Sequence, residues 1–174
     1  MKLIKKVVFV LLAIILTMAI VAFLLSGRQS AQRSRDMAAP PEKLWPLISD
    51  PRQWPKWAAW NQRDPNMKIT YEGADSGAGA KWHWESKSEG NGSMVFDSAE
   101  PNKQLSYTIA FPDMGSTAKG TIALEPAGSG TKVSWSFETE LGNNPMMRWF
   151  GLMIPNMVGK DFDTGLENLD RLAK

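Results

Sequence analysis

The sequence of 174 residues contains no cysteine and a single histidine, His83. The absence of cysteine excludes the lipidated cysteine of a lipoprotein, and a domain this rich in apolar residues can fold without disulfides. One histidine and no thiol leave only oxygen ligands for a metal, and these are unsuited to zinc. We therefore predict no metal site and no cofactor, and cysteine usage does not indicate a redox compartment.

A surplus of positive charge is also lacking in most of the chain. The formal net charge is +2, but three lysines lie in the first six residues and all 18 acidic residues come later. From Arg28 onward, 17 basic residues are balanced by 18 acidic ones. Nucleic-acid binding requires a basic surface that neutralises phosphates. This balance excludes nucleic acid as a partner.

Motifs for common kinds of catalysis are absent as well. The chain has no nucleophile-elbow pattern, and the glycines at 77 and 79 do not form a phosphate-binding loop. His83 lies between Trp82 and Trp84, and strand alternation places its side chain on the opposite face from both rings. Glu85 shares the face of His83, so the two could form an acid–base pair, but a solvated cross-strand pair is the favoured interpretation. We predict no catalytic residue.

The sequence begins instead with a long apolar run. It extends over 19 residues from Val7 to Leu25 and is interrupted only by Thr17. This length reaches the roughly 20 residues that cross a bilayer as a helix. A cleaved signal peptide is the alternative, but its apolar region would be only about 7 to 15 residues long and would end at an A-x-A-like site. We expect a membrane anchor at 1–27 with a transmembrane helix at about 7–25, a short linker at 28–33 and one folded domain at 34–174.

Basic residues flank the apolar run on both sides. They are Lys2, Lys5 and Lys6 before it and Arg28, Arg33 and Arg35 after it. The lysines lie closer to the membrane, so the positive-inside rule favours an amino terminus on the inner side. The expected location is the inner membrane of a bacterium, crossed once, with the folded domain in the periplasm.

Four of the eight tryptophans crowd into residues 39–61, APPEKLWPLISDPRQWPKWAAWN. The prolines between them predict two short or kinked helices rather than one long helix. Tryptophan has a large apolar surface and an N–H group that needs a partner. We therefore expect this segment to form a compact lid on an apolar interior.

From residue 67 the hydrophobic period changes to two, which indicates strands. The alternation is regular in 105–111 and 132–138 and weaker in 67–72, 80–88, 93–100 and 117–125. Breaks rich in glycine and asparagine predict short hairpin loops, so that successive strands are antiparallel neighbours. We predict a meander of six strands, or of seven if 32–38 is also a strand.

The end of the chain has the period of a helix. Asn144 before Pro145 is a typical start, and apolar residues then recur at steps of three and four. This predicts a helix over 145–174 with a kink at Pro155. A helix of this length, roughly 45 Å, is expected to lie across the sheet.

Taken together, these segments resemble the START-like (SRPBCC) superfamily, in its polyketide cyclase/dehydrase and lipid-transport branch. The resemblance is carried by the segment 39–61, by EGNGSMVF, LSYTIAF and GTKVSWSF in the sheet, and by GKDFDTGLENLDRL at the end. It covers about residues 34–174 and implies an α+β helix-grip fold, in which a curved antiparallel sheet of six or seven strands wraps a long C-terminal helix. It also implies an apolar cavity that holds a hydrophobic ligand, but no reaction, because members share no catalytic set.

In such a cavity, large apolar side chains from the lid, the sheet and the terminal helix are expected to contact the ligand. They are Trp57, Trp60, Trp82, Trp84, Met94, Phe96, Tyr107, Ile109, Trp135, Phe137, Phe150, Met153 and Met157.

Three functions follow as hypotheses. The first is a membrane-anchored domain that binds or transfers a hydrophobic small molecule, lipid-like or isoprenoid-like, taken up from the nearby bilayer. The second is a cyclase-type or dehydratase-type enzyme acting on such a ligand, with Glu85 and His83, or a buried tyrosine such as Tyr107, as the visible candidates. The third is a structural module whose tryptophans fill the interior and which binds an unknown partner protein.

Overall fold

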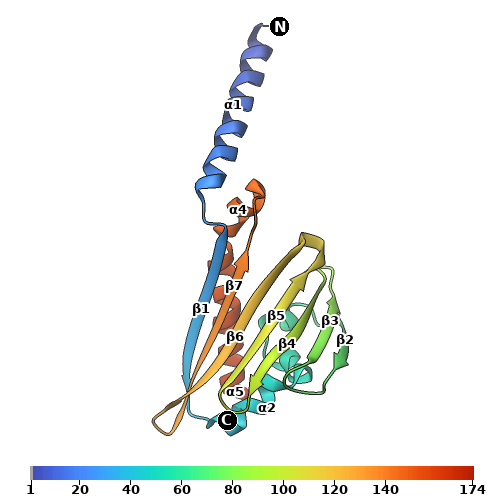
Figure 1. Cartoon of the computed structure of the whole chain (residues 1–174), viewed down its shortest axis with the longest axis vertical. Helices are drawn as coiled ribbons and strands as arrows, with labels where there is room; N and C mark the ends of the chain where they lie inside the picture. The colour runs from blue at the N-terminus through green and yellow to red at the C-terminus, as the bar shows by residue number, and fades with distance from the viewer. Residues whose placement is uncertain (1) are drawn as a thin grey trace.

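The computed structural model describes residues 2–174, in which an N-terminal helix projects from an α+β domain (Figure 1). The helices are α1 (Lys2–Leu24), α2 (Pro41–Ser49), α3 (Ala59–Arg63), α4 (Pro145–Gly151) and α5 (Ile154–Leu172), with 3₁₀ turns η1 (Pro51–Lys56) and η2 (Pro112–Met114). The strands are β1 (Arg28–Met37), β2 (Lys68–Gly73), β3 (Ala80–Glu85), β4 (Gly92–Glu100), β5 (Gln104–Phe111), β6 (Ser116–Ala127) and β7 (Gly130–Glu140).

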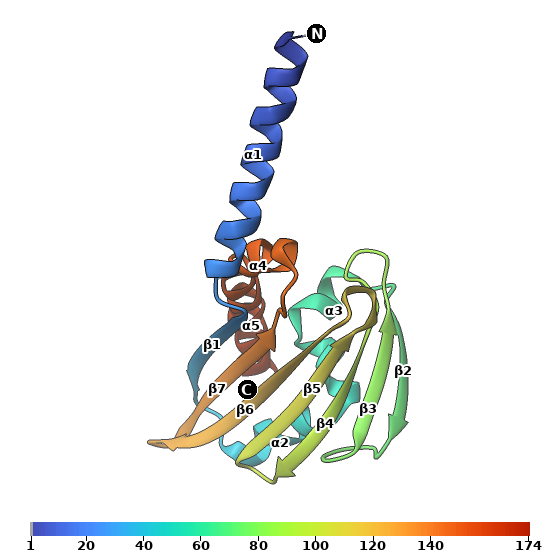
Figure 2. The ribbon, with the colours of Figure 1, turned by 45° about the horizontal axis from the view of Figure 1, so that its top comes forward.

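The seven strands form one antiparallel sheet in the order β1-β7-β6-β5-β4-β3-β2. Strands β2 to β7 are the predicted meander. The first strand of the chain, β1, extends this sheet at one edge by pairing with the last strand, β7 (Figure 2). The sheet curves around α5, which lies across its concave face. This is the helix-grip arrangement that the sequence predicted.

Strand β1 differs from its prediction. It begins at Arg28, opposite Glu140, rather than at residue 32. The expected linker at 28–33 is therefore part of the sheet, and only residues 25–27 separate α1 from it. β1 is an edge strand held by backbone hydrogen bonds, and of its ten residues only Ala31 and Met37 are buried, so its sequence lacks the alternation that marks the other strands.

The predicted terminal helix is two helices rather than one kinked helix. α4 ends at Gly151, and the amides of Leu152 and Met153 donate to carbonyls only three residues back. Pro155 then occupies the first turn of α5, where its missing N–H is not needed. The i→i−3 hydrogen bonds at residues 152 and 153 end α4 before Pro155 is reached. Pro155 therefore lies at the start of a new helix and does not kink a continuous one.

Helix α5 packs tightly against the sheet through its apolar stripe. Phe162, Leu166 and Leu169 are buried, and the ring of Phe162 stacks on that of Trp135 with centroids 4.0 Å apart. A Cβ at Gly165 would lie 2.8 Å from the Trp135 ring. The absence of a side chain at residue 165 therefore allows the helix to approach this tryptophan.

Helix α1 points away from the domain (Figure 1). It is long and apolar enough to cross a membrane by length and composition. Its side chains are exposed except near its end, where Ala22 is buried. The helix thus contributes nothing to the core between the sheet and α5.

Candidate ligand-binding site

The tryptophan-rich segment closes one end of the interior. Trp54 and Trp57 are buried, and their Nε1 atoms donate to the carbonyls of Ile48 at 2.8 Å and of Leu47 at 3.0 Å. These bonds satisfy the polar atoms of both indoles, so the rings can enter the core without cost for an unpaired N–H. Six aromatic rings surround Trp54: those of Trp57, Trp60, Trp82, Phe96, Tyr107 and Trp135. This aromatic cluster fills its end of the interior with side chains.

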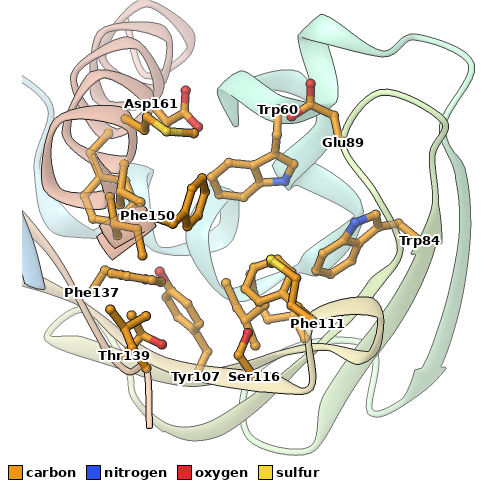
Figure 3. Close-up of a pocket in the computed structure, with 18 of the residues that line it drawn as sticks. Trp60, Trp84, Glu89, Tyr107, Phe111, Ser116, Phe137, Thr139, Phe150 and Asp161 are labelled. Atoms are coloured by element: carbon orange, nitrogen blue, oxygen red, sulfur yellow. The ribbon is translucent and has the colours of Figure 1, made fainter. Parts of the chain in front are cut away.

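The other end holds a cavity of about 260 Å³ between α5 and the concave face of the sheet (Figure 3). The sheet and the loops at its end contribute Trp84, Met94, Tyr107, Ile109, Phe111, Met114, Ser116, Phe137, Thr139 and Leu141. Helices α4 and α5 contribute Met147, Phe150, Ile154, Met157, Val158 and Phe162. Trp60, Arg63, Glu89 and Asp161 complete the wall. The lining is mostly apolar, with few polar groups, which is typical of sites for small hydrophobic molecules.

Tyr107 places a hydrogen-bond donor in this apolar wall. Its oxygen accepts a 2.6 Å hydrogen bond from Nε1 of Trp135, and both side chains are buried. Among residues 2–174 no acceptor receives the proton of the Tyr107 hydroxyl. Burial raises the pKa of Tyr107 well above its ordinary value, so the hydroxyl stays protonated near neutral pH. The cavity wall therefore carries a neutral O–H donor.

Two further hydroxyl groups lie near the same end of the sheet. Thr139 donates to the carbonyl of Thr117 at 2.8 Å and keeps its acceptor capacity, and Ser116 also lines the wall. No charged side chain lies among these groups, since the charges of the wall are confined to Arg63, Glu89 and Asp161. The hydroxyl groups on this side of the cavity suit a ligand with an uncharged oxygen rather than an ion.

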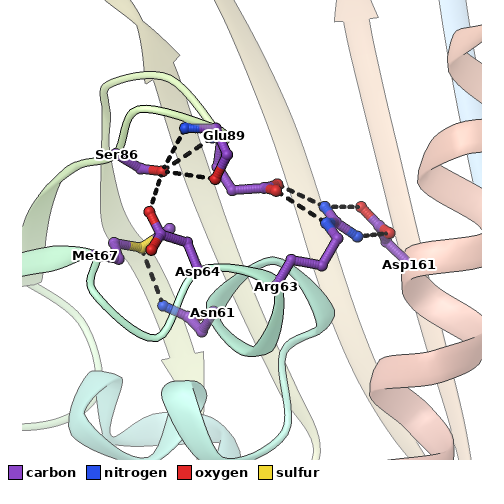
Figure 4. A network of polar contacts seen from close by, with 8 residues as sticks. Asn61, Arg63, Asp64, Met67, Ser86, Glu89 and Asp161 are labelled. Carbon is purple, nitrogen blue, oxygen red and sulfur yellow. Dashed lines mark hydrogen bonds and ion pairs between the residues drawn. The ribbon is translucent and has the colours of Figure 1, made fainter.

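Arg63, at the end of α3, bridges two carboxylates at the cavity rim (Figure 4). Its Nη1 and Nη2 donate to Asp161 at 2.5 and 3.1 Å, and its Nε and Nη2 donate to Glu89 at 3.0 and 2.7 Å. The hydrogen bonds that Arg63 donates to Glu89 and then to Asp161 raise the pKa of Arg63 further above its ordinary value. The guanidinium thus ties α3, the β3–β4 loop and α5 together.

Ser86 and Asp64 hold the loop that carries Glu89. The Ser86 hydroxyl donates to Asp64 Oδ2 at 2.6 Å and accepts the backbone N–H of Glu89 at 2.9 Å (Figure 4). Arg63 and Asp64 are adjacent in the chain, so one short segment orients both the loop and the ion pairs. The rim is accordingly a connected network rather than an isolated salt bridge.

The structure places the thirteen predicted cavity residues in three groups. Trp60, Trp84, Met94, Tyr107, Ile109, Phe137, Phe150 and Met157 line the cavity. Trp57, Trp82, Phe96 and Trp135 do not line it, because their rings pack around Trp54 in the aromatic cluster. Met153 also lies outside, since it falls in the turn between α4 and α5, where it is 53% exposed.

Sequence reasoning missed the polar rim. Arg63, Glu89 and Asp161 lie on three elements far apart in the chain, and no local pattern links them. It also missed Phe111 and Met114, which reach the cavity from the end of β5 and the turn η2. The position of Phe111 on the apolar face of its predicted strand was the only available signal.

His83 and Glu85 lie apart from the cavity. Nε2 of His83 is 3.3 Å from Oε2 of Glu72 on β2, on the outer face of the sheet, and its side chain is 41% exposed. Contacts with His83 and then Lys81 lower the pKa of Glu72. Glu85 is exposed at the end of β3. In residues 2–174, no group of three or more histidine, aspartate or glutamate side chains is arranged to hold a metal ion.

Comparison with solved structures finds the same fold in other bacterial proteins. Protein CV1439 from Chromobacterium violaceum matches with a TM-score of 0.61 at 20% identity, covering 83% of this chain and 96% of its own. Protein MLL2253 from Mesorhizobium loti matches with a TM-score of 0.62 at 20% identity and the same coverage. The Aha1 protein from Colwellia psychrerythraea, solved as a dimer, matches at 0.55 and 16% identity over 81% of this chain and 92% of its own. At these identities the likeness concerns the fold alone.

Comparison with curated protein sequences found no match. A sequence model of one family, however, matches residues 28–174, which include the sheet, the cavity and both C-terminal helices. The matched region begins at the first residue of β1, in agreement with the domain seen in the structure. The chain belongs to the family described as polyketide cyclase / dehydrase and lipid transport.

Proposed function

We propose that this protein binds or transfers a hydrophobic small molecule, with α1 as its membrane anchor. The observation that carries the proposal is the apolar cavity of about 260 Å³ between α5 and the sheet. Family membership agrees with a hydrophobic ligand but leaves its identity open. The volume of the cavity and the polarity of its wall restrict the ligand further.

The size of the cavity favours a small ligand. Sites for drug-sized molecules measure about 300–1,000 Å³, and this cavity lies just below that range. The aromatic cluster around Trp54 blocks its extension toward α2. A single acyl or isoprenoid chain, or a small ring system, therefore suits the cavity better than a phospholipid with two chains.

The polarity of the wall favours a ligand with one neutral acceptor oxygen. The Tyr107 hydroxyl has a proton to donate, and a carbonyl, ester or quinone oxygen would accept it. An ionised carboxylate is disfavoured there, because no cation lies among the hydroxyl-bearing residues to offset its desolvation. The proposed ligand is thus apolar, with a single uncharged oxygen at Tyr107.

Catalysis receives less support than binding. His83 and Glu85 lie outside the cavity, and Tyr107 keeps its proton too strongly to act as a base near neutral pH. The module with a filled interior is also less favoured, because side chains fill only the end around Trp54. The cavity at the other end of the interior favours a ligand-binding role over both alternatives.

The test is native mass spectrometry of the full chain, extracted from bacterial membranes in mild detergent. We expect a discrete added mass that organic solvent extraction releases as a hydrophobic compound. Val158→Trp places a large ring on the cavity wall and should abolish the added mass. Val95→Trp is the matched control on the outer face of β4 and should retain it. Absence of any bound compound across several membrane extracts would contradict the proposal.

A further inference from the structure

Helix α4 lies directly against the last turns of α1. The indole Nε1 of Trp149 donates to the carbonyl of Met18 at 3.2 Å. Nη1 of Arg148 donates to the carbonyls of Phe23 and Leu25 at 3.1 and 3.3 Å, and its guanidinium lies 5.6 Å from the centre of the Phe23 ring. The two helices are therefore joined by polar contacts, although 120 residues or more separate them in the chain.

These contacts set the height of α4 along α1. Met18 lies seven residues before Leu25, the end of the apolar run, which corresponds to about 10 Å along the helix axis. If α1 spans a bilayer, Trp149 lies inside the boundary of the apolar layer rather than outside it. An indole with one polar atom is suited to that boundary.

The surface of α4 and the following turn is apolar where it is exposed. Met146 is 79% exposed, Leu152 and Met153 are each 53% exposed, and Phe150 is 38% exposed. Arg148 is the only charged residue from Pro145 to Met153. Its guanidinium donates hydrogen bonds to the carbonyls of Phe23, Leu25 and Gly142. Such a cluster of exposed large apolar residues is unusual on a surface that faces only water.

The same segment forms part of the cavity wall. Met147 and Phe150 line the cavity from α4, and Ile154 and Met157 line it from the start of α5. Met157 is also 49% exposed, so this wall lies near the surface. One short segment thus connects the outer apolar surface to the interior of the cavity.

We propose that α4 and the 152–153 turn form a second membrane-contacting element, which inserts into the lipid interface beside α1 and holds the cavity open toward the bilayer. The partner of this surface is the lipid of the membrane that α1 crosses. This inference rests on the proposed role of α1 as an anchor. It adds that the domain has a defined orientation, in which the ligand passes between bilayer and cavity past Met147 and Phe150.

The lack of native cysteine permits a direct test in the full chain. Single cysteines at Met146→Cys and Met153→Cys are labelled with an environment-sensitive fluorophore after reconstitution into vesicles. The vesicles contain lipids that carry a quencher either at a shallow acyl position, for residues 146 and 153, or at a mid-chain position, for residue 16. Leu16→Cys, 63% exposed within α1, reports insertion of the anchor. Ser129→Cys, in the β6–β7 turn at the other end of the ten-residue strand β1, is the control roughly 30 Å away.

Quenching at residues 16, 146 and 153, with none at 129, is the expected result. Quenching at residue 16 alone would overturn the contact of α4 while leaving the anchor and the ligand-binding proposal intact. Absence of quenching at all four positions would show that α1 is not inserted, and would overturn this inference together with the anchor. A second readout is accessibility to a water-soluble thiol reagent, which should be reduced at 146 and 153 at least several-fold compared with 129.

Discussion

The indole Nε1 of Trp135 donates a 2.6 Å hydrogen bond to the phenolic oxygen of Tyr107, and both side chains are at most 1% exposed. The bond fixes the direction of the Tyr107 hydroxyl, because its oxygen is held as an acceptor and its proton must point elsewhere. Trp135 in turn stacks on Phe162 of α5. The donor in the cavity wall is therefore positioned by the same packing that holds the terminal helix on the sheet.

Removing the hydroxyl should destabilise the fold and weaken ligand binding. Tyr107→Phe leaves the buried N–H of Trp135 without its acceptor, which costs about 1–3 kcal/mol of unfolding free energy. Urea unfolding followed by circular dichroism measures this loss. Tyr71→Phe is the matched control at a half-buried position of the edge strand β2, opposite Trp82, and should change stability by about 0.5 kcal/mol or less. Equal losses for the two variants would contradict the role of the buried bond.

Tyr107 should ionise only above the ordinary range for tyrosine as pH rises. Burial raises the pKa of Tyr107, so in the Tyr71→Phe variant tyrosinate absorbance should not appear near pH 10, the ordinary range for tyrosine. The folded-state pKa lies above the unfolded one, so the unfolded chain loses this proton first. The free energy of unfolding should accordingly decrease as pH rises above about 10. A titration of Tyr107 at its ordinary pKa in the folded protein would show that water reaches it.

A methyl group behind the Tyr107 ring should destabilise the protein. Gly120 lies opposite Tyr107 in the pairing of β5 with β6, and a Cβ there would be 2.1 Å from the ring carbon Cζ. Overpacking of this kind costs typically about 1–3 kcal/mol, so Gly120→Ala should reduce the unfolding free energy by that amount.

A double-mutant cycle isolates the cause of this effect. In a Tyr107→Leu background the clashing ring atoms are gone, and Gly120→Ala should cost less than half as much as in the wild-type chain. Strictly additive losses would show that the ring is not what makes glycine necessary here.

Breaking the rim network should speed ligand exchange more than it affects stability. Arg63→Gln removes the link from α3 to Glu89 and Asp161, whose side chains are 18% and 26% exposed. Half-exposed ion pairs contribute only about 1 kcal/mol or less, but these connect three elements around the cavity. We expect a dissociation rate of the bound ligand that is several-fold faster, measured by stopped-flow displacement.

Arg52→Gln is the control for the rim. It removes a comparable exposed pair, between Arg52 and Asp75, that contributes nothing to the cavity wall. Its ligand dissociation rate should match that of the wild type. Equal acceleration in both variants would show that general loosening, and not the rim, controls exchange.

Much of the fold could be predicted from local patterns. The meander followed from a period of two with glycine-rich breaks, and the helical end of the chain followed from a period of 3.6. β1 was predicted four residues short, because an edge strand with two buried residues carries almost no pattern. The break between α4 and α5 was missed because the turn at Leu152 and Met153 precedes the proline that suggested it.

The candidate site was predictable only in part. Alternation identified the sheet residues that face inward, and eight of the thirteen expected residues line the cavity. Alternation could not separate Trp84, which lines the cavity, from Trp82, which packs on Trp54, because both project from one face of β3. Which of the two rings lines the cavity depends on where the tryptophan rings of residues 39–61 pack in the folded protein.

The sequence by itself determined that the chain has an apolar N-terminal helix, an antiparallel meander and a helical end, because these properties reside in the spacing of apolar residues. Only the tertiary structure decided which aromatic rings fill the interior and which border a cavity. It also brought Arg63 to Asp161 and Trp149 to Met18, across 98 and 131 residues of chain. Such contacts have no local signature, since they arise from the way the sheet curves around α5 and returns the C-terminal helices to the start of the chain.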